Sequence, residues 1–225
     1  MQNRNGLNKI RVWDLPTRVF HWALVATITS LAVSGLVGGN AMVWHFRLGY
    51  LALSLLLFRV IWGVIGGRWS RFRSFIYSPK NLVSYLKGRG KPEHSVGHSP
   101  IGAASVFGML FFLLAQVGSG LTSDDEIAFT GPLSRFVSNA TVSLATNYHK
   151  DIGKWILLAL VVMHIVAILF YIWRKHNLLP AMLHGDKDLV AAVPPSRDDA
   201  VSRVAALIVF GASCGVAVWI ASLGS

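Results

Sequence analysis

The segment HKDIGKWILLALVVMHIVAILFYIW, residues 149–173, decides the class of fold. After Lys154 it holds no charged residue, and it is long enough for a helix to cross the hydrocarbon of a membrane, which takes about 20 residues. Four more stretches have a similar length and composition: 18–38, 45–66, 101–121 and 203–222. Over the whole chain 53% of the residues are hydrophobic and 14% are charged, whereas soluble domains average about 25% charged residues. The sequence therefore predicts an all-α membrane protein with five transmembrane helices.

Basic residues mark one side of the predicted helices. The formal net charge is +11, and Lys and Arg gather before the first span, between the second and third, and between the fourth and fifth. Since positively charged loops stay in the cytoplasm, we expect a membrane protein, surrounded by lipid, with a cytoplasmic N-terminus and a C-terminus on the outer side. In so apolar a chain the charge indicates cytoplasmic loops and not a nucleic-acid partner.

The predicted organisation has four parts. Residues 1–17 form a cytoplasmic N-terminal segment, 18–175 a four-helix transmembrane domain, 176–202 a cytoplasmic linker, and 203–225 a fifth, C-terminal transmembrane helix. In the loop between the second and third spans, the stretch from Pro79 to Lys87 is predicted to form a short helix at the membrane surface.

Four of the eight histidines lie in or at the ends of predicted spans: His21, His45, His149 and His164. An ionisable side chain at membrane depth is costly and usually functional. His149 and His164 are fifteen residues apart, which on a helix is about 22 Å of rise and about 60° of rotation, so they share a face at two depths. Because the spans alternate in direction, we expect two facing pairs, His21 with His164 toward the cytoplasm and His45 with His149 toward the outside.

Paired imidazoles from two helices favour two non-covalent haems b, each with two histidine ligands. The single cysteine, Cys214, excludes a CxxCH site for covalent haem. Taken one at a time, each histidine could instead only hydrogen-bond across helices. Arg47 and Arg59, on the second span, are candidate partners of haem propionates, with snorkelling to lipid headgroups as the other interpretation.

Several separated motifs resemble those of one family. The chain reads RVWDLPTRVFHW at 11–22, HFRLGY at 45–50, FRVIWGVIGGRWSRF at 58–72, SPIGA at 99–103, SDDEIAFTGPL at 123–133 and YHKDIGKW at 148–155. Over about residues 11–175 it resembles the bacterial cytochrome b561 and nickel–iron-hydrogenase b-type cytochrome family. In that family four helices hold two haems b between histidines, which implies the same two pairs here. Members pass electrons between quinone and a hydrogenase or a c-type cytochrome, and a stand-alone branch resembles superoxide oxidase.

The leading expectation is transmembrane electron transfer by a di-haem b-type cytochrome. It would connect the quinone pool with a redox partner on the outer face, such as a c-type cytochrome or a hydrogenase-like subunit. The acidic residues Asp124, Asp125 and Glu126 could dock a basic partner protein or could simply form a solvated loop.

Two other functions remain open. A superoxide oxidase would pass electrons from superoxide to ubiquinone, and the cations Arg47, Lys150 and Lys154 would attract the anion. A haem-free transporter is disfavoured, because the spans contain no acidic residue except Asp151 at an end. For the quinone head group the candidates are His98, Arg71 and Arg73, whereas Gln116 could equally hydrogen-bond to the backbone.

Overall fold

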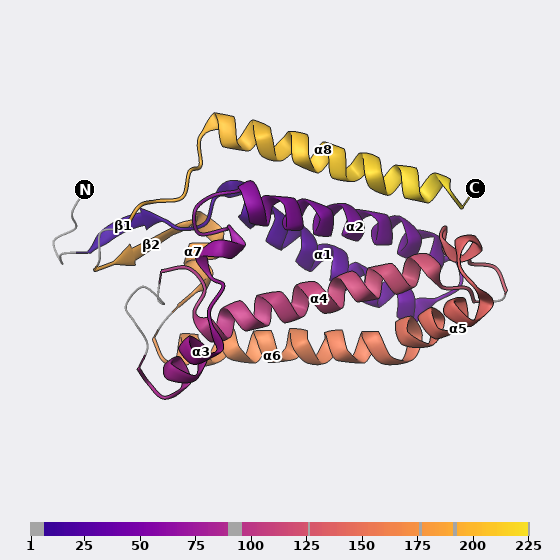
Figure 1. Ribbon diagram of the computed structural model, residues 1–225, viewed down its shortest axis with the longest axis horizontal. Helices are drawn as coiled ribbons and strands as arrows, with labels where there is room; N and C mark the ends of the chain where they lie inside the picture. The colour runs from indigo at the N-terminus through magenta and orange to yellow at the C-terminus, as the bar shows by residue number, and fades with distance from the viewer. Residues whose placement is uncertain (1–6, 90–95, 126, 176, 191–192, 225) are drawn as a thin grey trace. The chain divides into compact units, whose positions relative to one another are not determined.

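Five long helices make up most of the described chain (Figure 1). The computed structural model describes residues 7–89, 96–125, 127–175, 177–190 and 193–224. Each of the five is long and apolar enough to cross a membrane, α6 doing so together with the helical turns before it. The prediction of five such helices is confirmed, and the chain is a multi-pass membrane protein. The helices are α1 (Leu15–Val37), α2 (Ala41–Ile65), α4 (Pro100–Thr122), α6 (Lys154–Trp173) and α8 (Ala200–Ser222).

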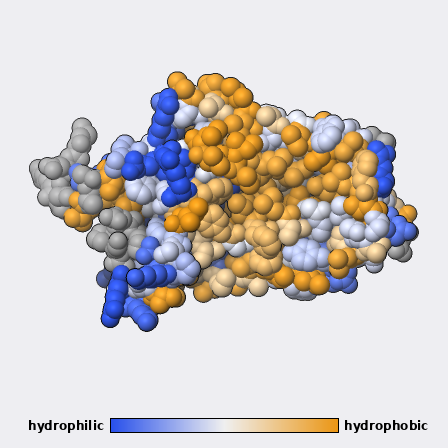
Figure 2. Space-filling model, in the orientation of Figure 1, coloured by the Kyte–Doolittle hydropathy of each residue, from blue (hydrophilic) through white to orange (hydrophobic). Residues whose placement is uncertain are grey.

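Large apolar side chains cover the outer surfaces of these helices. On α6, Val166 is 57% exposed, Leu169 is 58% exposed and Trp173 is 75% exposed. The face in Figure 2 is coloured largely as hydrophobic over the helices. A contiguous apolar surface of this extent marks contact with membrane or protein, and on spanning helices it is the surface that meets lipid.

The helix that carries the fourth predicted span begins before that span. Two short helical segments, α5 (Asn139–Asn147) and η4 (Tyr148–Gly153), lead directly into α6. Ser138 caps α5, because its side chain accepts a hydrogen bond from the amide of Thr141. The residues of α5 are mostly small and polar and show no apolar run, so this extension of the helix was not predicted.

Local signals explain two further features. Gly38 and Gly39, which join α1 to α2, have φ angles of 66° and 53°, a left-handed region that glycine enters at little cost. The predicted surface helix is confirmed as a helix by α3 (Pro79–Leu86), which starts with proline and is capped by Ser78.

The described chain forms two compact units, and each of the five long helices contributes one segment to each unit. The first, here called the Asp14 unit, contains the residues up to Phe20 together with Arg59–Phe107 and His164–Ile208. The second, the His45 unit, contains His21–Phe58, Gly108–Met163 and the residues from Val209 on.

A buried carboxylate organises the Asp14 unit. Asp14 is completely buried and accepts hydrogen bonds from the amides of Thr17 (2.8 Å) and Gly67 (3.1 Å), the indole of Trp62 (3.2 Å) and the hydroxyl of Ser70 (2.7 Å). A Cβ on Gly67 would lie 2.2 Å from the carboxylate, so only glycine fits there. These bonds tie the start of α1 to the end of α2.

The segment predicted as a linker is folded onto this unit. It contains α7 (Leu179–His184) and β2 (Asp186–Leu189), and β2 pairs antiparallel with β1 (Asn8–Arg11), with Arg11 opposite Asp186 (Figure 1). Ser196 then donates from its amide to Arg11 O and from its hydroxyl to Val12 O, both at 2.7 Å. Pairing between residues so far apart in sequence leaves no local signal.

Asp198 joins the strand, α1 and α8 by charge. It accepts from Arg11 Nη1 (2.6 Å), Arg203 Nε (3.1 Å) and the Leu15 amide (3.2 Å), and its side chain is only 6% exposed. Burial raises the pKa of this carboxyl, but the hydrogen bonds from Arg203, Leu15 and Arg11 outweigh it and hold the pKa below its usual range.

We expect Asp198→Asn to destabilise the protein by about 1.5–3 kcal/mol at neutral pH, the range for hydrogen bonds to charged groups. Because the pKa of Asp198 is lower in the folded chain, its stabilisation is present above the unfolded pKa of about 3.9 and is lost as the pH falls through the folded value. The difference in melting temperature between wild type and variant, followed by circular dichroism in detergent, should therefore shrink at acidic pH. Asp199→Asn is the control, since Asp199 and its partner Arg197 are both exposed. An equal effect of the two substitutions at pH 7 would contradict this assignment.

Candidate functional site

His45 is held by α1 through one ring nitrogen. Its Nδ1 lies 3.1 Å from the carbonyl oxygen of Leu31 and 3.2 Å from the hydroxyl of Ser34. A carbonyl oxygen can only accept, so Nδ1 carries the proton and donates. The other nitrogen, Nε2, then keeps its lone pair, which is the form in which imidazole binds a metal.

His149 is held in the same way by α4. Its Nδ1 lies 2.9 Å from the carbonyl oxygen of Gln116 and 3.4 Å from the hydroxyl of Ser119. Nδ1 again donates its proton, so Nε2 keeps a free electron pair. A metal-binding histidine commonly gives its other N–H to a carbonyl, which sets the tautomer and the ring orientation.

The two rings are spaced as two ligands of one metal atom would be. The ring centres of His45 and His149 are 6.1 Å apart, and the ring planes are inclined by 88°. Two imidazoles that share one metal have ring centres about 6 Å apart, since each metal–nitrogen bond is about 2 Å and each nitrogen lies about 1 Å from its ring centre. Within the described residues no group of three or more His, Cys, Asp or Glu could hold a metal ion. Two histidine ligands alone fit the axial positions of haem iron.

Each histidine rests in a cradle of the same pattern, formed by a carbonyl, a serine three residues later and a glycine one residue after that. The cradle of His45 is Leu31, Ser34 and Gly35, and the cradle of His149 is Gln116, Ser119 and Gly120. A Cβ on Gly35 would lie 3.1 Å from His45 Cε1, and one on Gly120 would lie 2.8 Å from His149 Cε1. A side chain at Gly120 would therefore force the His149 ring to shift, and one at Gly35 would press closely against the His45 ring.

The cradles were missed in the sequence, although a signal was present. The tripeptide Ser-Gly-Leu occurs at 34–36 and again at 119–121, in two different predicted spans. Its meaning depends on which histidine faces it, and that is a tertiary contact.

A π-helical turn at His149 was also not predicted. The segment η4 (Tyr148–Gly153), which contains this histidine, is a π-helix. Short π-helical turns inserted in α-helices are rare and occur frequently at functional sites.

The structure places the other predicted haem ligands in different units. His21 lies on α1 within the His45 unit, half-buried, with its ring 5.1 Å from that of Trp22. His164 lies on α6 within the Asp14 unit and is half-buried as well. The pairing of these two histidines stays a prediction.

The two predicted arginines differ in environment. Arg47 is exposed, with its guanidinium 5.0 Å from the ring centre of Trp44. Arg59 is only 5% exposed and lies over the ring of Phe72 at 4.7 Å. Its Nη1 is buried and has no hydrogen-bond partner among the described residues. Such a donor is costly, and an added anionic group would satisfy it. The Asp14 carboxylate already acts on Arg59 by charge.

The acidic loop uses one carboxylate internally. Asp125 accepts hydrogen bonds from the amides of Ile127 (3.0 Å), Ala128 (2.9 Å) and Phe129 (2.8 Å), and these lower its pKa. Glu126 lies outside the described residues. Of the cations proposed to attract an anion, Lys150 and Lys154 are exposed, and Lys154 lies over the ring of Trp155.

The candidates for quinone binding are placed in two regions. His98 stacks against Trp13 (4.7 Å between ring centres) and Phe75 (4.4 Å) in the Asp14 unit. Arg71 and Arg73 lie in the same unit. Gln116, in contrast, donates from Nε2 to the backbone carbonyl of His149 at 2.9 Å, which is one of the two alternatives that the sequence left open for it.

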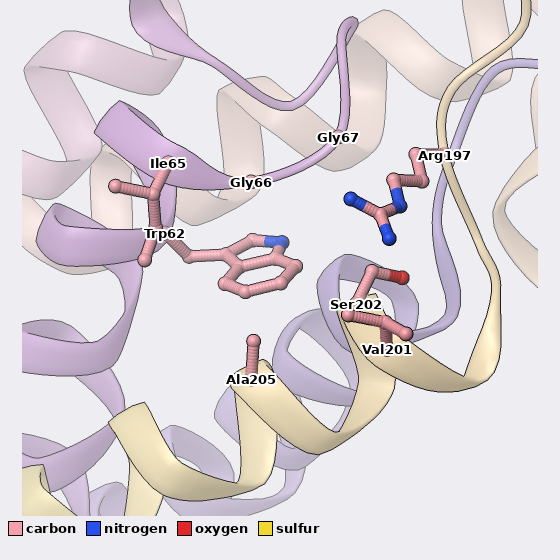
Figure 3. Close-up of a pocket in the computed structure, with 8 residues that line it drawn as sticks. All are labelled: Trp62, Ile65, Gly66, Gly67, Arg197, Val201, Ser202 and Ala205. Carbon is pink, nitrogen blue, oxygen red and sulfur yellow. The ribbon is translucent and has the colours of Figure 1, made fainter.

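A small cavity in the Asp14 unit lies where α2 ends and α8 begins (Figure 3). Its volume is about 120 Å³, below the range of about 300–1,000 Å³ that is usual for ligand pockets. The Arg197 guanidinium and the Ser202 hydroxyl lie opposite the indole of Trp62. The cavity contains no histidine and does not fit a metal centre. It is lined by Trp62, Ile65, Gly66, Gly67, Arg197, Val201, Ser202 and Ala205.

Comparison with known proteins shows the family of the chain. The family described as prokaryotic cytochrome b561 matches residues 12–185. A probable Ni/Fe-hydrogenase B-type cytochrome subunit from Rhizobium leguminosarum bv. viciae is 24% identical, over 79% of this chain and 88% of its own length. A probable Ni/Fe-hydrogenase 1 B-type cytochrome subunit from Escherichia coli K12 is 23% identical, over 77% and 88%, and a probable Ni/Fe-hydrogenase B-type cytochrome subunit from Azotobacter vinelandii is 25% identical, over 82% and 93%. No solved structure matches the chain.

We expect Gly120→Ala to lower the haem-to-protein ratio of the purified protein, because the new methyl group would displace the His149 ring. Displacing a ligand or its support typically weakens metal binding by about 10–100-fold. Gly118→Ala is the matched control, because Gly118 lies on the same helix and a Cβ there would have no neighbouring atom within 4 Å. Pyridine haemochrome spectra give the haem content, and a full complement in Gly120→Ala would rule out the close approach described here.

Proposed function

Because the chain belongs to the prokaryotic cytochrome b561 family, we propose that it is a di-haem b-type cytochrome that transfers electrons between the quinone pool and a redox protein on the outer face of the bacterial inner membrane. Membership supports a membrane b-type cytochrome that transfers electrons, and with it haem b as the cofactor. The observation that carries the finer proposal is the pair of His45 and His149, with ring centres 6.1 Å apart and Nε2 of each ring left free by its cradle.

At this first site the chain's own residues set the ligand state before haem binds. The carbonyls of Leu31 and Gln116 hold the proton on Nδ1 of each ring, so no proton has to leave Nε2 for ligation. The glycines allow both helices to lie against the rings. When bound, haem b supplies a reversible one-electron carrier, while the protein places it and tunes its potential.

For the second haem we propose His21 and His164 as ligands. The support is their depth in the spans and the family's arrangement of two haems between histidines. Arg59 supports an anionic cofactor group within the Asp14 unit, since its buried Nη1 lacks an acceptor among the described residues and a propionate would provide one. Arg47, which is exposed, is proposed as the propionate partner at the outer haem.

The partners follow from the relatives and from charge. The three relatives are named as cytochrome subunits of Ni/Fe hydrogenases, so we propose a hydrogenase-like subunit or a c-type cytochrome as the outer redox partner. The basic loops support a cytoplasmic N-terminus and a periplasmic C-terminus. A stand-alone superoxide oxidase is the alternative, and it needs no second protein.

Single substitutions test the ligand pairs. We expect His45→Ala or His149→Ala to remove the haem bound by this pair and to leave the second haem. His21→Ala or His164→Ala should remove the second haem and leave the first, because each haem needs both of its ligands. Haem content and optical spectra of the purified variants provide the measurement. His184→Ala, at an exposed position on α7, is the control. Loss of only one haem from a His21→Ala, His45→Ala double variant would contradict the pairing.

Rapid kinetics test the direction of coupling. When the purified protein is mixed anaerobically with a quinol analogue in a stopped-flow instrument, we expect fast reduction of two haems per chain. Haem absorbance and the haem-to-protein ratio are measured on the same sample. Haems that stay oxidised with quinol but are reduced by superoxide would replace this proposal with the superoxide oxidase.

A further inference from the structure

The two histidine cradles differ at their first residue. The carbonyl that holds His45 belongs to Leu31, which has an apolar side chain, whereas the one that holds His149 belongs to Gln116. The remaining two positions are Ser and Gly in both cradles. The glutamine side chain is therefore the chemical feature that distinguishes the His149 cradle.

Gln116 contacts His149 at two points. Its carbonyl oxygen accepts from the ring Nδ1 at 2.9 Å, and its side-chain Nε2 donates to the backbone oxygen of His149 at 2.9 Å. One residue thus grips both the ring and the backbone of the same histidine. A ring can rotate about a single hydrogen bond, but the second bond also fixes the Cα from which the ring extends.

The side chain of Gln116 has little freedom to move. A Cβ on Gly153 would lie 2.0 Å from its Oε1, so Gly153 leaves just enough space for the amide. Oε1 is buried and has no hydrogen-bond partner among the described residues. The amide is therefore held by its donor side, through His149, and by close packing against η4.

The contact falls within the π-helical turn. A π-helix shifts backbone hydrogen bonds to a spacing of five residues and widens the turn. The Gln116 amide, which comes from a different helix, donates to the carbonyl of His149 at 2.9 Å, inside this widened turn. The bond therefore ties the turn that carries the histidine to α4.

From these contacts we propose that Gln116 is a positioning residue, which holds His149 in the π-helical turn and thereby sets the orientation of this ligand and the retention of the haem it binds. The inference rests on the proposed function, since it concerns the haem ligated by His45 and His149. It predicts an asymmetry between the two ligands, because His45 has no such second contact through Leu31.

Two substitutions remove the side-chain donor and keep the backbone carbonyl. Gln116→Leu gives this cradle the residue found in the other one, and Gln116→Met preserves the length of the side chain. We expect both variants to bind two haems at synthesis and to release the His45–His149 haem about 10–100-fold faster, the usual effect of losing a group that supports a metal ligand. Haem transfer to excess apomyoglobin measures the release rate.

A spectroscopic readout separates positioning from a general loss of stability. The electron paramagnetic resonance spectrum of a low-spin ferric haem depends on the angle between its two imidazole planes, which is 88° in this chain. We expect the signal of this haem to shift in both variants and the signal of the second haem to stay unchanged. Thr29→Val is the control, because Thr29 bonds only to a carbonyl of its own helix in the described contacts.

The outcomes are distinct for this inference and for the proposed function. Wild-type release rates and an unchanged spectrum in both Gln116 variants would overturn the positioning role and leave the di-haem proposal standing. An equal change in Thr29→Val would also overturn it, since the effect would then be unspecific. A wild-type protein without a haem at His45 and His149 would overturn the function first, and with it this inference.

Discussion

Hydrocarbon neither donates nor accepts hydrogen bonds, so a polar group within the spans of this chain is costly unless it finds a partner inside the protein or in a bound group. The histidines show the result of this constraint. His45 and His149 each give their Nδ1 proton to a helix carbonyl of a neighbouring span, which leaves one nitrogen per ring with a free electron pair. The hydrogen bond that satisfies Nδ1 of each imidazole thus also leaves Nε2 in the form that can bind a metal. The need for this hydrogen bond comes from the surrounding lipid.

The two cradles solve one steric problem twice. A carbonyl followed by serine and glycine on the next turn brings a helix close enough to hold an imidazole, and the glycine is needed because a methyl group would meet the ring. The repetition on α1 and α4 gives His45 of α2 and His149 of η4 the same tautomer. The π-helical turn at His149 adds a local distortion, and the Gln116 amide donates a hydrogen bond to the carbonyl of that residue.

The Asp14 unit obeys the same constraint with different groups. Four donors surround the buried carboxylate of Asp14, and three cationic or amide donors converge on Asp198. Buried charges of this kind persist only when they are fully hydrogen-bonded. The bonds of Asp14 connect the start of α1 to the end of α2, and those of Asp198 connect the strand β1 to the start of α8. The segment before the fifth helix is consequently part of a folded unit, which the polar composition of residues 176–202 did not reveal.

Composition and the length of the apolar stretches determined that the chain spans a membrane with five helices, because a stretch of roughly 20 predominantly apolar residues is the length that a helix needs to cross the hydrocarbon. The same reading selected the four histidines, since ionisable groups in lipid are rare enough to stand out one by one. The strand pairing of Arg11 with Asp186, the contacts of Asp14, and the cradles around His45 and His149 were decided by the tertiary structure. Each of these contacts joins residues from distant parts of the chain, through hydrogen bonds to a carbonyl or carboxylate or through close packing against a glycine. A serine next to a glycine looks the same in any apolar helix, and it becomes part of a ligand site only when a neighbouring helix places a histidine against it.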